Sequence, residues 1–157
     1  MDKIKTTEGD AIVRDAKFAI VASRFNEFIV DSLLKGALRC LEQHGAADTD
    51  VEVVRVPGSF EMPLAVDKLA ATRRFDGIIA LGAVIRGGTP HFEYVASECV
   101  RGIAAAGQKH GIPVGFGVLT CDTVEQAIER AGTKAGNKGV EAALAVIEMV
   151  NLLRRID

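Results

Sequence analysis

The chain has 157 residues, 48% of them hydrophobic and 25% charged, with a formal net charge of -2. These values are typical of one globular domain, 1–157, that can bury a core without disulfides or a structural metal. Acidic and basic residues are interspersed, which argues against nucleic-acid binding. The first residues lack the apolar core of a signal peptide, and no run of about 18 apolar residues occurs, so neither export nor membrane insertion is expected.

The cysteines indicate a reducing compartment. Cys40, Cys99 and Cys121 are odd in number, far apart in the sequence and without a CxxC pair. Such cysteines are typical of reduced thiols, so we expect a cytoplasmic protein.

Short runs rich in valine and isoleucine alternate with longer stretches of helical periodicity. The runs are KFAIVAS (17–23), VEVVRV (51–56), DGIIALG (76–82) and PVGFGVLT (113–120). Because they are almost continuously apolar, they are typical of parallel strands covered by helices on both faces. The pattern predicts a single-domain α/β fold, a three-layer α/β/α sandwich around a four-stranded parallel sheet with right-handed crossovers.

Helices are expected between and after these strands. Gly45 follows the first as a C′ residue, Ser59 and Thr89 are the expected N-caps of the second and third, and Asp122 or Thr123 opens the fourth. The expected helical ranges are 27–44, 59–73, 90–109, 122–131 and 140–154.

The N-terminal arm, residues 1–16, is too short and mixed to pack alone. Its AIV segment (11–13) could add an edge strand to this sheet or to that of a neighbouring subunit. Toward the other end of the chain, GTKAGNKG (132–139) separates the last two helices because its glycines break the helical pattern.

In an open parallel sheet, ligands bind outside the carboxyl ends of the strands. The loops expected there are SRFNEF, PGSFEMP, GAVIRGGTPH and TCDT. In the third, Gly87 and Gly88 allow a ligand to approach the backbone, and the free N–H groups at the following helix start favour an anion such as phosphate. A plain tight turn remains the alternative for these glycines.

His91 is expected near the second position of the third helix, at the positive end of the helix dipole. An imidazolium ion is disfavoured there, so the side chain should tend to be neutral and able to accept a proton. His44 and His110 each precede a glycine at a helix end, where a structural capping role is expected.

Other candidates have a structural alternative each. Phe25 could stack on a flat ring or pack in the core, and Glu61 could bind hydroxyls or only favour a helix start. Arg130 has a planar fork that suits phosphate, although a cation in a last helical turn is common. Lys138 is either solvated or placed at a site. The sequence holds no dinucleotide or P-loop motif, nucleophile elbow or metal-ligand spacing, so a cofactor-free site for a small phosphorylated substrate is expected.

Four longer segments occur in order along the chain: VASRFNEFIVDSLLKGA, VRVPGSFEMPLAVDKLA, GAVIRGGTPHFEYVASE and AIERAGTKAGNKGVEAALAVIEM. Together they resemble the 6,7-dimethyl-8-ribityllumazine synthase family over nearly the whole chain. The resemblance implies a flavodoxin-like fold and a transferase of riboflavin biosynthesis without metal or cofactor. Its substrates are 5-amino-6-(D-ribitylamino)uracil, a ribitylaminopyrimidinedione, and 3,4-dihydroxy-2-butanone 4-phosphate, which condense with loss of phosphate and water.

The resemblance also implies roles for individual residues. His91 would move protons during imine formation, phosphate elimination and ring closure, and Arg130 would help to hold the phosphate. Phe60 stands where some relatives have tryptophan, and Phe116 would cover the ring from an adjacent subunit. The implied substrate-binding residues are Phe25, Asn26, Ser59, Phe60, Glu61, Ala83, Val84, Ile85, Gly88, Thr89, Phe116 and Lys138.

Family members form pentamers with shared active sites, and some assemble into an icosahedral capsid with riboflavin synthase as cargo. ERAGTKAGNKGVE shows no insertion between the last helices, so the resemblance allows a 60-mer here. Three alternatives stay open: a riboflavin synthase of archaeal type, which would dismutate the lumazine, a non-enzymatic flavodoxin-like or receiver module, and a shell that has lost catalysis.

Overall fold

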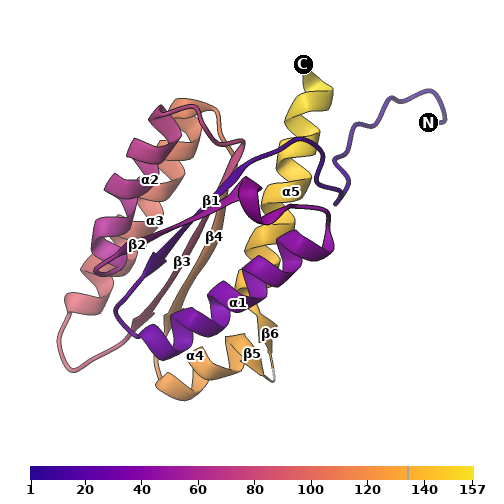
Figure 1. The fold of residues 1–157 in the computed structure, drawn as a ribbon. Coiled ribbons are helices and arrows are strands. Elements are labelled where there is room, and N and C mark those ends of the chain that lie inside the picture. Colours follow the sequence, from indigo (N-terminus) through magenta and orange to yellow (C-terminus); the bar gives the residue numbers. More distant parts are fainter. Residues whose placement is uncertain (134) are drawn as a thin grey trace.

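Four parallel strands form the central sheet of the computed structural model, which describes residues 1–133 and 135–157 (Figure 1). The predicted parallel sheet is therefore confirmed. β3 runs beyond its predicted end at Gly82 because it stays paired with β4 as far as Cys121. The strands are β1 (Phe18–Ser23), β2 (Val51–Val56), β3 (Gly77–Ile85) and β4 (Val114–Cys121), in the order β2-β1-β3-β4.

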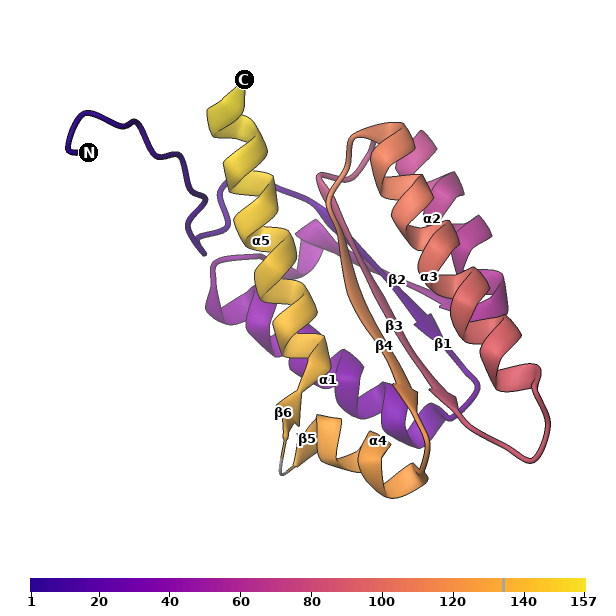
Figure 2. The same ribbon diagram turned by 180° about the vertical axis from the view of Figure 1, so that it is seen from behind.

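Helices cover both faces of this sheet, which confirms the three-layer sandwich. α1 (Glu27–Gln43) and α5 (Lys138–Ile156) lie on one face, and α2 (Met62–Ala71) and α3 (His91–His110) lie on the other (Figures 1 and 2). The short helix α4 (Val124–Arg130) lies near the carboxyl ends of the strands.

Each strand contributes alternate side chains to two separate cores, because successive side chains point to opposite faces of a sheet. In β1, Phe18, Ile20 and Ala22 pack on the α1–α5 side, whereas Ala19 and Val21 pack on the α2–α3 side. A strand with apolar side chains on both faces needs a layer of helices on each face to bury them. The nearly continuous apolar runs in the sequence predicted this arrangement.

Two expected helix starts are wrong. Ser59 does not cap a helix: it begins a 3-10 turn, Ser59–Glu61, and its side chain is buried while α2 starts at Met62. Thr89 does not cap α3, whose first residue is His91 and whose N-cap position is Pro90. His91 therefore occupies the first helical position, one residue earlier than expected.

The end of α1 and the start of α4 are as predicted, whereas the start of α5 is not. Gly45 follows α1 with a positive φ of 115°, and Thr123 caps α4 by accepting a hydrogen bond from Gln126 N at 3.1 Å. α5 begins earlier than expected, because Asn137 Oδ1 accepts hydrogen bonds from the backbone N–H groups of Gly139 and Val140. The short antiparallel strands β5 (Ala131–Thr133) and β6 (Gly136–Asn137) were not predicted.

The second half of the N-terminal arm lies against α5, whereas its first residues extend away from the helix (Figure 1). Asn151 Nδ2 donates hydrogen bonds to the backbone oxygens of Asp10 and Ile12, at 2.8 and 2.9 Å. Residues 11–13 form no strand in this chain, so the expectation of an edge strand in its own sheet is wrong. Pairing with a neighbouring subunit stays a prediction.

The capping role expected for His44 is confirmed, because its ring nitrogen Nδ1 lies 2.7 Å from Cys40 O at the end of α1. His110 instead joins α3 to α2: its Nε2 lies 2.9 Å from Asp67 Oδ1. All three cysteines are free, as expected. They are also buried, and burial raises the pKa of the Cys99 thiol to about 11. No helix in 1–133 or 135–157 is both long and apolar enough to cross a membrane.

The close packing of α5 on β4 depends on a glycine. A Cβ at Gly115 would lie 2.5 Å from the backbone oxygen of Ala142 and 2.7 Å from Val146 Cγ2. Gly115→Ala should therefore lower the free energy of unfolding by about 1–3 kcal/mol, measured by denaturant titration. Gly87→Ala is the control, since nothing lies within 4 Å of its Cβ position, and equal losses in both variants would contradict this account.

Candidate active site

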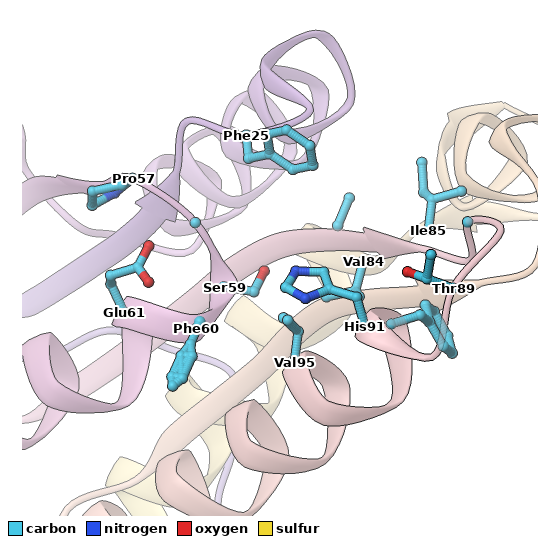
Figure 3. A pocket seen from close by; sticks show the side chains of 14 residues that line it. Phe25, Pro57, Ser59, Phe60, Glu61, Val84, Ile85, Thr89, His91 and Val95 are labelled. Atoms are coloured by element: carbon cyan, nitrogen blue, oxygen red, sulfur yellow. The ribbon is translucent and has the colours of Figure 1, made fainter.

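The loops that follow β1, β2 and β3 surround one pocket at the carboxyl edge of the sheet (Figure 3). Its volume, about 650 Å³, is in the range of sites for small molecules. Its walls are mostly apolar, with a few polar groups among them. The lining residues are Phe25, Pro57, Gly58, Ser59, Phe60, Glu61, Ala83, Val84, Ile85, Gly87, Thr89, His91, Phe92 and Val95.

Hydrogen bonds hold the first loop against its neighbours. Arg24 N donates to Val56 O at 2.8 Å, and Phe25 N donates to Pro57 O at 3.0 Å, so the β1–α1 turn continues beside the end of β2. Asn26 adopts a left-handed conformation (φ 60°), and its Nδ2 donates to Ala83 O at 2.9 Å. Asn26 thus joins the turn to β3, and it lies beside the pocket residues instead of among them.

Two aromatic rings are exposed at the pocket. Phe25 is 71% exposed and Phe60 is 54% exposed, whereas phenylalanine side chains are usually buried in folded proteins. In the view of Figure 3, Ser59 and His91 lie between these two rings. Exposed rings beside a cavity suit a ligand with a flat ring of its own, because offset stacking adds to the burial of apolar surface.

The polar groups of the pocket can serve as acceptors and donors. The Glu61 carboxylate extends toward Gly58: its Oε1 lies 3.3 Å from the point where a Gly58 side chain would begin. His91, exposed at the start of α3, presents its imidazole to the same cavity (Figure 3). A carboxylate can accept hydrogen bonds from hydroxyls, and an imidazole can move a proton at neutral pH.

The glycines before α3 are not explained by the fold. A Cβ on Gly87 or Gly88 would meet nothing within 4 Å, and neither residue has a positive φ. Gly87 and Thr89 line the pocket, and Gly88 lies between them. Among the described residues, therefore, neither crowding nor backbone conformation requires glycine at these two positions.

Three predicted site residues lie outside this pocket. Phe116, Arg130 and Lys138 line a second cavity, of about 420 Å³, together with Cys121 and Glu141. Arg130 Nη1 donates to Gln126 O at 3.0 Å, and Lys138 Nζ lies 3.9 Å from Glu141 Oε1. Burial raises the pKa of the Cys121 thiol, an effect that the nearby Arg130 guanidinium partly offsets. One chain thus does not bring these residues together with His91.

The sequence interpretation missed several lining residues, among them Pro57, Gly58, Phe92 and Val95. Phe92 and Val95 could have been found, because they follow His91 closely on the helix that carries it. The Arg86 guanidinium was also missed: it lies 4.7 Å from the centre of the Phe92 ring and donates to Asp122 Oδ1 at 2.8 Å.

Among the described residues, no group of three His, Cys, Asp or Glu side chains could hold a metal ion.

Comparisons with known proteins agree on one family. The sequence model of the family described as 6,7-dimethyl-8-ribityllumazine synthase matches residues 15–154. A protein of that name from Desulfovibrio desulfuricans is 58% identical over 156 residues, which cover 99% of this chain and 100% of the relative. Another, from Halorhodospira halophila, is 57% identical over 155 residues, covering 98% of this chain and 99% of the relative.

Proposed function

The chain belongs to the 6,7-dimethyl-8-ribityllumazine synthase family, and we propose that the pocket at the carboxyl edge of its sheet performs the reaction. This transferase condenses 5-amino-6-(D-ribitylamino)uracil with 3,4-dihydroxy-2-butanone 4-phosphate to 6,7-dimethyl-8-ribityllumazine, releasing phosphate and water, in the penultimate step of riboflavin biosynthesis. The observation that carries the assignment to this pocket is that His91, Glu61 and the exposed rings of Phe25 and Phe60 line the same cavity.

The pyrimidinedione binds against the apolar side of the pocket. Phe25 stacks on its ring, Ser59 and Phe60 line the place where it lies, and Glu61 accepts hydrogen bonds from the ribityl hydroxyls. The exposure of both rings supports this role, because a bound ring would remove their apolar surface from water. Ala83, Val84 and Ile85, at the end of β3, form the wall beside it, and Asn26 holds the Phe25 turn against that wall.

The butanone phosphate binds where α3 begins. Gly88 and Thr89 precede the first helical residue, where free N–H groups and the helix dipole favour a phosphate. His91 then lies within the same loop and helix start as the phosphate, so it can move protons in imine formation and in phosphate elimination. Holding the amine of one substrate against the carbonyl of the other contributes further, since proximity alone lowers such barriers by several kcal/mol.

Arg130, Lys138 and Phe116 complete this pocket from a neighbouring subunit. They lie in a separate cavity of their own chain, beside β4, one of the two edge strands. A neighbouring groove, which Phe116 also lines, is mostly apolar. Val100 of α3 and Met149 of α5 are 46% and 41% exposed along the groove that Phe116 also lines. A second copy of the chain would bury this groove and bring Arg130 to the phosphate.

We extend the proposal to a cytoplasmic homopentamer of single-domain subunits, in which the arm 1–16 contacts a neighbour. The short connection between α4 and α5 allows pentamers to assemble into an icosahedral 60-mer, with riboflavin synthase as its cargo. The substrates are small molecules, and neither nucleic acid nor a membrane takes part.

His91→Ala should slow lumazine formation by about 10²- to 10⁴-fold without abolishing it, because proton transfer is lost while substrate positioning remains. Product is followed by absorbance and fluorescence with both substrates, against a heat-killed control. His44→Ala is the matched histidine control and should keep the wild-type rate, since His44 lies at the end of α1. An unchanged rate in His91→Ala would remove its role, and a wild-type protein that forms no lumazine would overturn the proposed function.

Gly88→Ala keeps the backbone N–H but adds a methyl group in the space that the phosphate would occupy. It should raise the KM for the butanone phosphate about tenfold or more, as expected if one hydrogen bond to a charged group can no longer form. The KM for the pyrimidinedione and the denaturation midpoint should stay at their wild-type values, because a Cβ at Gly88 meets nothing in the chain. Steady-state kinetics with each substrate varied in turn measure this. Equal increases of both KM values would contradict a phosphate role for the loop.

A mixed assembly tests whether the pocket is shared. His91→Ala and Arg130→Ala chains, each impaired alone, are co-expressed with different tags and purified through both. If neighbours share the pocket, about a quarter of the sites receive both native residues, and activity returns to about that fraction of the wild-type value. Activity that stays at the level of the two single variants would show that each chain uses its own Arg130.

A further inference from the structure

One buried hydroxyl at the end of β1 lacks a hydrogen-bond partner. Ser23 is the last residue of this strand and is fully buried, and its Oγ bonds to none of the residues in 1–133 and 135–157. An unpaired buried hydroxyl costs free energy, so folded proteins contain few of them. Alanine would fit here at no such cost, which indicates that the hydroxyl serves something other than stability.

Ser23 lies at the carboxyl end of β1, the edge of the sheet at which the pocket is found. Its side chain continues the row of Ala19 and Val21, which faces α2 and α3, the side on which the pocket opens. β1 and β3 pair as far as Ala22 and Leu81, so Ser23 and Gly82 follow at the next position of the two neighbouring strands. The row is thus apolar throughout the core and ends in a hydroxyl at the site.

Gly82 brings this hydroxyl close to a residue of the pocket. A Cβ on Gly82 would lie 2.7 Å from Ser59 Oγ and 3.2 Å from Ser23 Oγ, so both hydroxyls use the space that the glycine leaves. Ser59 lines the pocket, and Figure 3 shows its hydroxyl directed toward the cavity. One hydroxyl is thus buried, and the other is beside it at the surface of the cavity.

We propose that Ser23 is a positioning residue for Ser59, an inference that rests on the proposed function. When the pyrimidinedione binds, the Ser23 hydroxyl donates a hydrogen bond to Ser59 Oγ, and the proton of Ser59 is directed at a carbonyl or ring nitrogen of the substrate. A hydroxyl has one proton and two acceptor lone pairs, and it rotates freely unless a neighbour fixes it. In a closed site of low dielectric, two linked hydroxyls strengthen one another.

The dissociation constant of 5-amino-6-(D-ribitylamino)uracil, measured by calorimetry, tests this inference. Ser23→Ala should weaken binding about threefold to tenfold, the range expected for one neutral hydrogen bond, while leaving the stability equal or higher. Ser23→Cys should weaken it similarly, because a thiol of similar size is a poor donor. Ser32→Ala, which removes a hydroxyl on α1 that bonds to Phe28 O, is the control and should bind as the wild type does.

A double-mutant cycle separates positioning from packing. If Ser23 acts through Ser59, the Ser23→Ala change has no further effect in a Ser59→Ala background. An unchanged dissociation constant in Ser23→Ala, or the same loss in both backgrounds, would overturn the inference. Turnover of the wild type is measured in parallel. A wild type that binds the pyrimidinedione but forms no lumazine would contradict the proposed function, and the role of Ser23 would then be decided by the dissociation constants alone. A wild type that does not bind it would end both.

Discussion

The parallel pairing of the strands decides where each functional group of this molecule lies. Because β2, β1 and β3 run in the same direction and are neighbours in that order, their carboxyl ends meet at one edge of the sheet. Each strand is followed by a loop that supplies part of the pocket: Phe25 after β1, Ser59–Glu61 after β2 and Gly87–His91 after β3. Antiparallel pairing of any one of them would send its loop to the opposite edge.

Strand pairing alone does not fix the shape of the loops; hydrogen bonds from the backbone and from the Asn26 side chain do this for the turn after β1. The bond from Phe25 N to Pro57 O and the bond from the Asn26 amide to Ala83 O connect the turn after β1 with both neighbours. Asn26 tolerates its left-handed conformation better than most residues, and its side chain gains a partner in return. The exposed ring of Phe25 is therefore presented by a turn that is held on both sides.

The sequence predicted the sheet and its layers because a nearly continuous apolar run of strand length fits a parallel strand that is buried on both faces. It failed where local chemistry and tertiary structure compete. Ser59 is a good N-cap by type, but a 3-10 turn places it at the pocket. α3 starts at His91, one residue later than a cap at Thr89 would give. The β5–β6 pair is too short to give a periodic signal, and Asn137, which begins α5, is recognised as a cap only through its bonds to Gly139 and Val140.

Part of the site could be predicted because the sheet could be predicted. Most of the residues expected to bind substrate come from loops whose strands are adjacent, so their convergence follows from the topology. Arg130 and Lys138 follow β4, one of the two edge strands of the sheet, and their cavity includes side chains of that strand. No spacing in the sequence gives this separation. This chain leaves the rings of Phe25 and Phe60 exposed in one cavity and places the cationic groups of Arg130 and Lys138 in another. Ser23 lies at the carboxyl edge of the sheet too, fully buried and with no hydrogen-bond partner for its hydroxyl in 1–133 or 135–157, a local cost in stability of the kind that folded proteins keep mainly at functional positions.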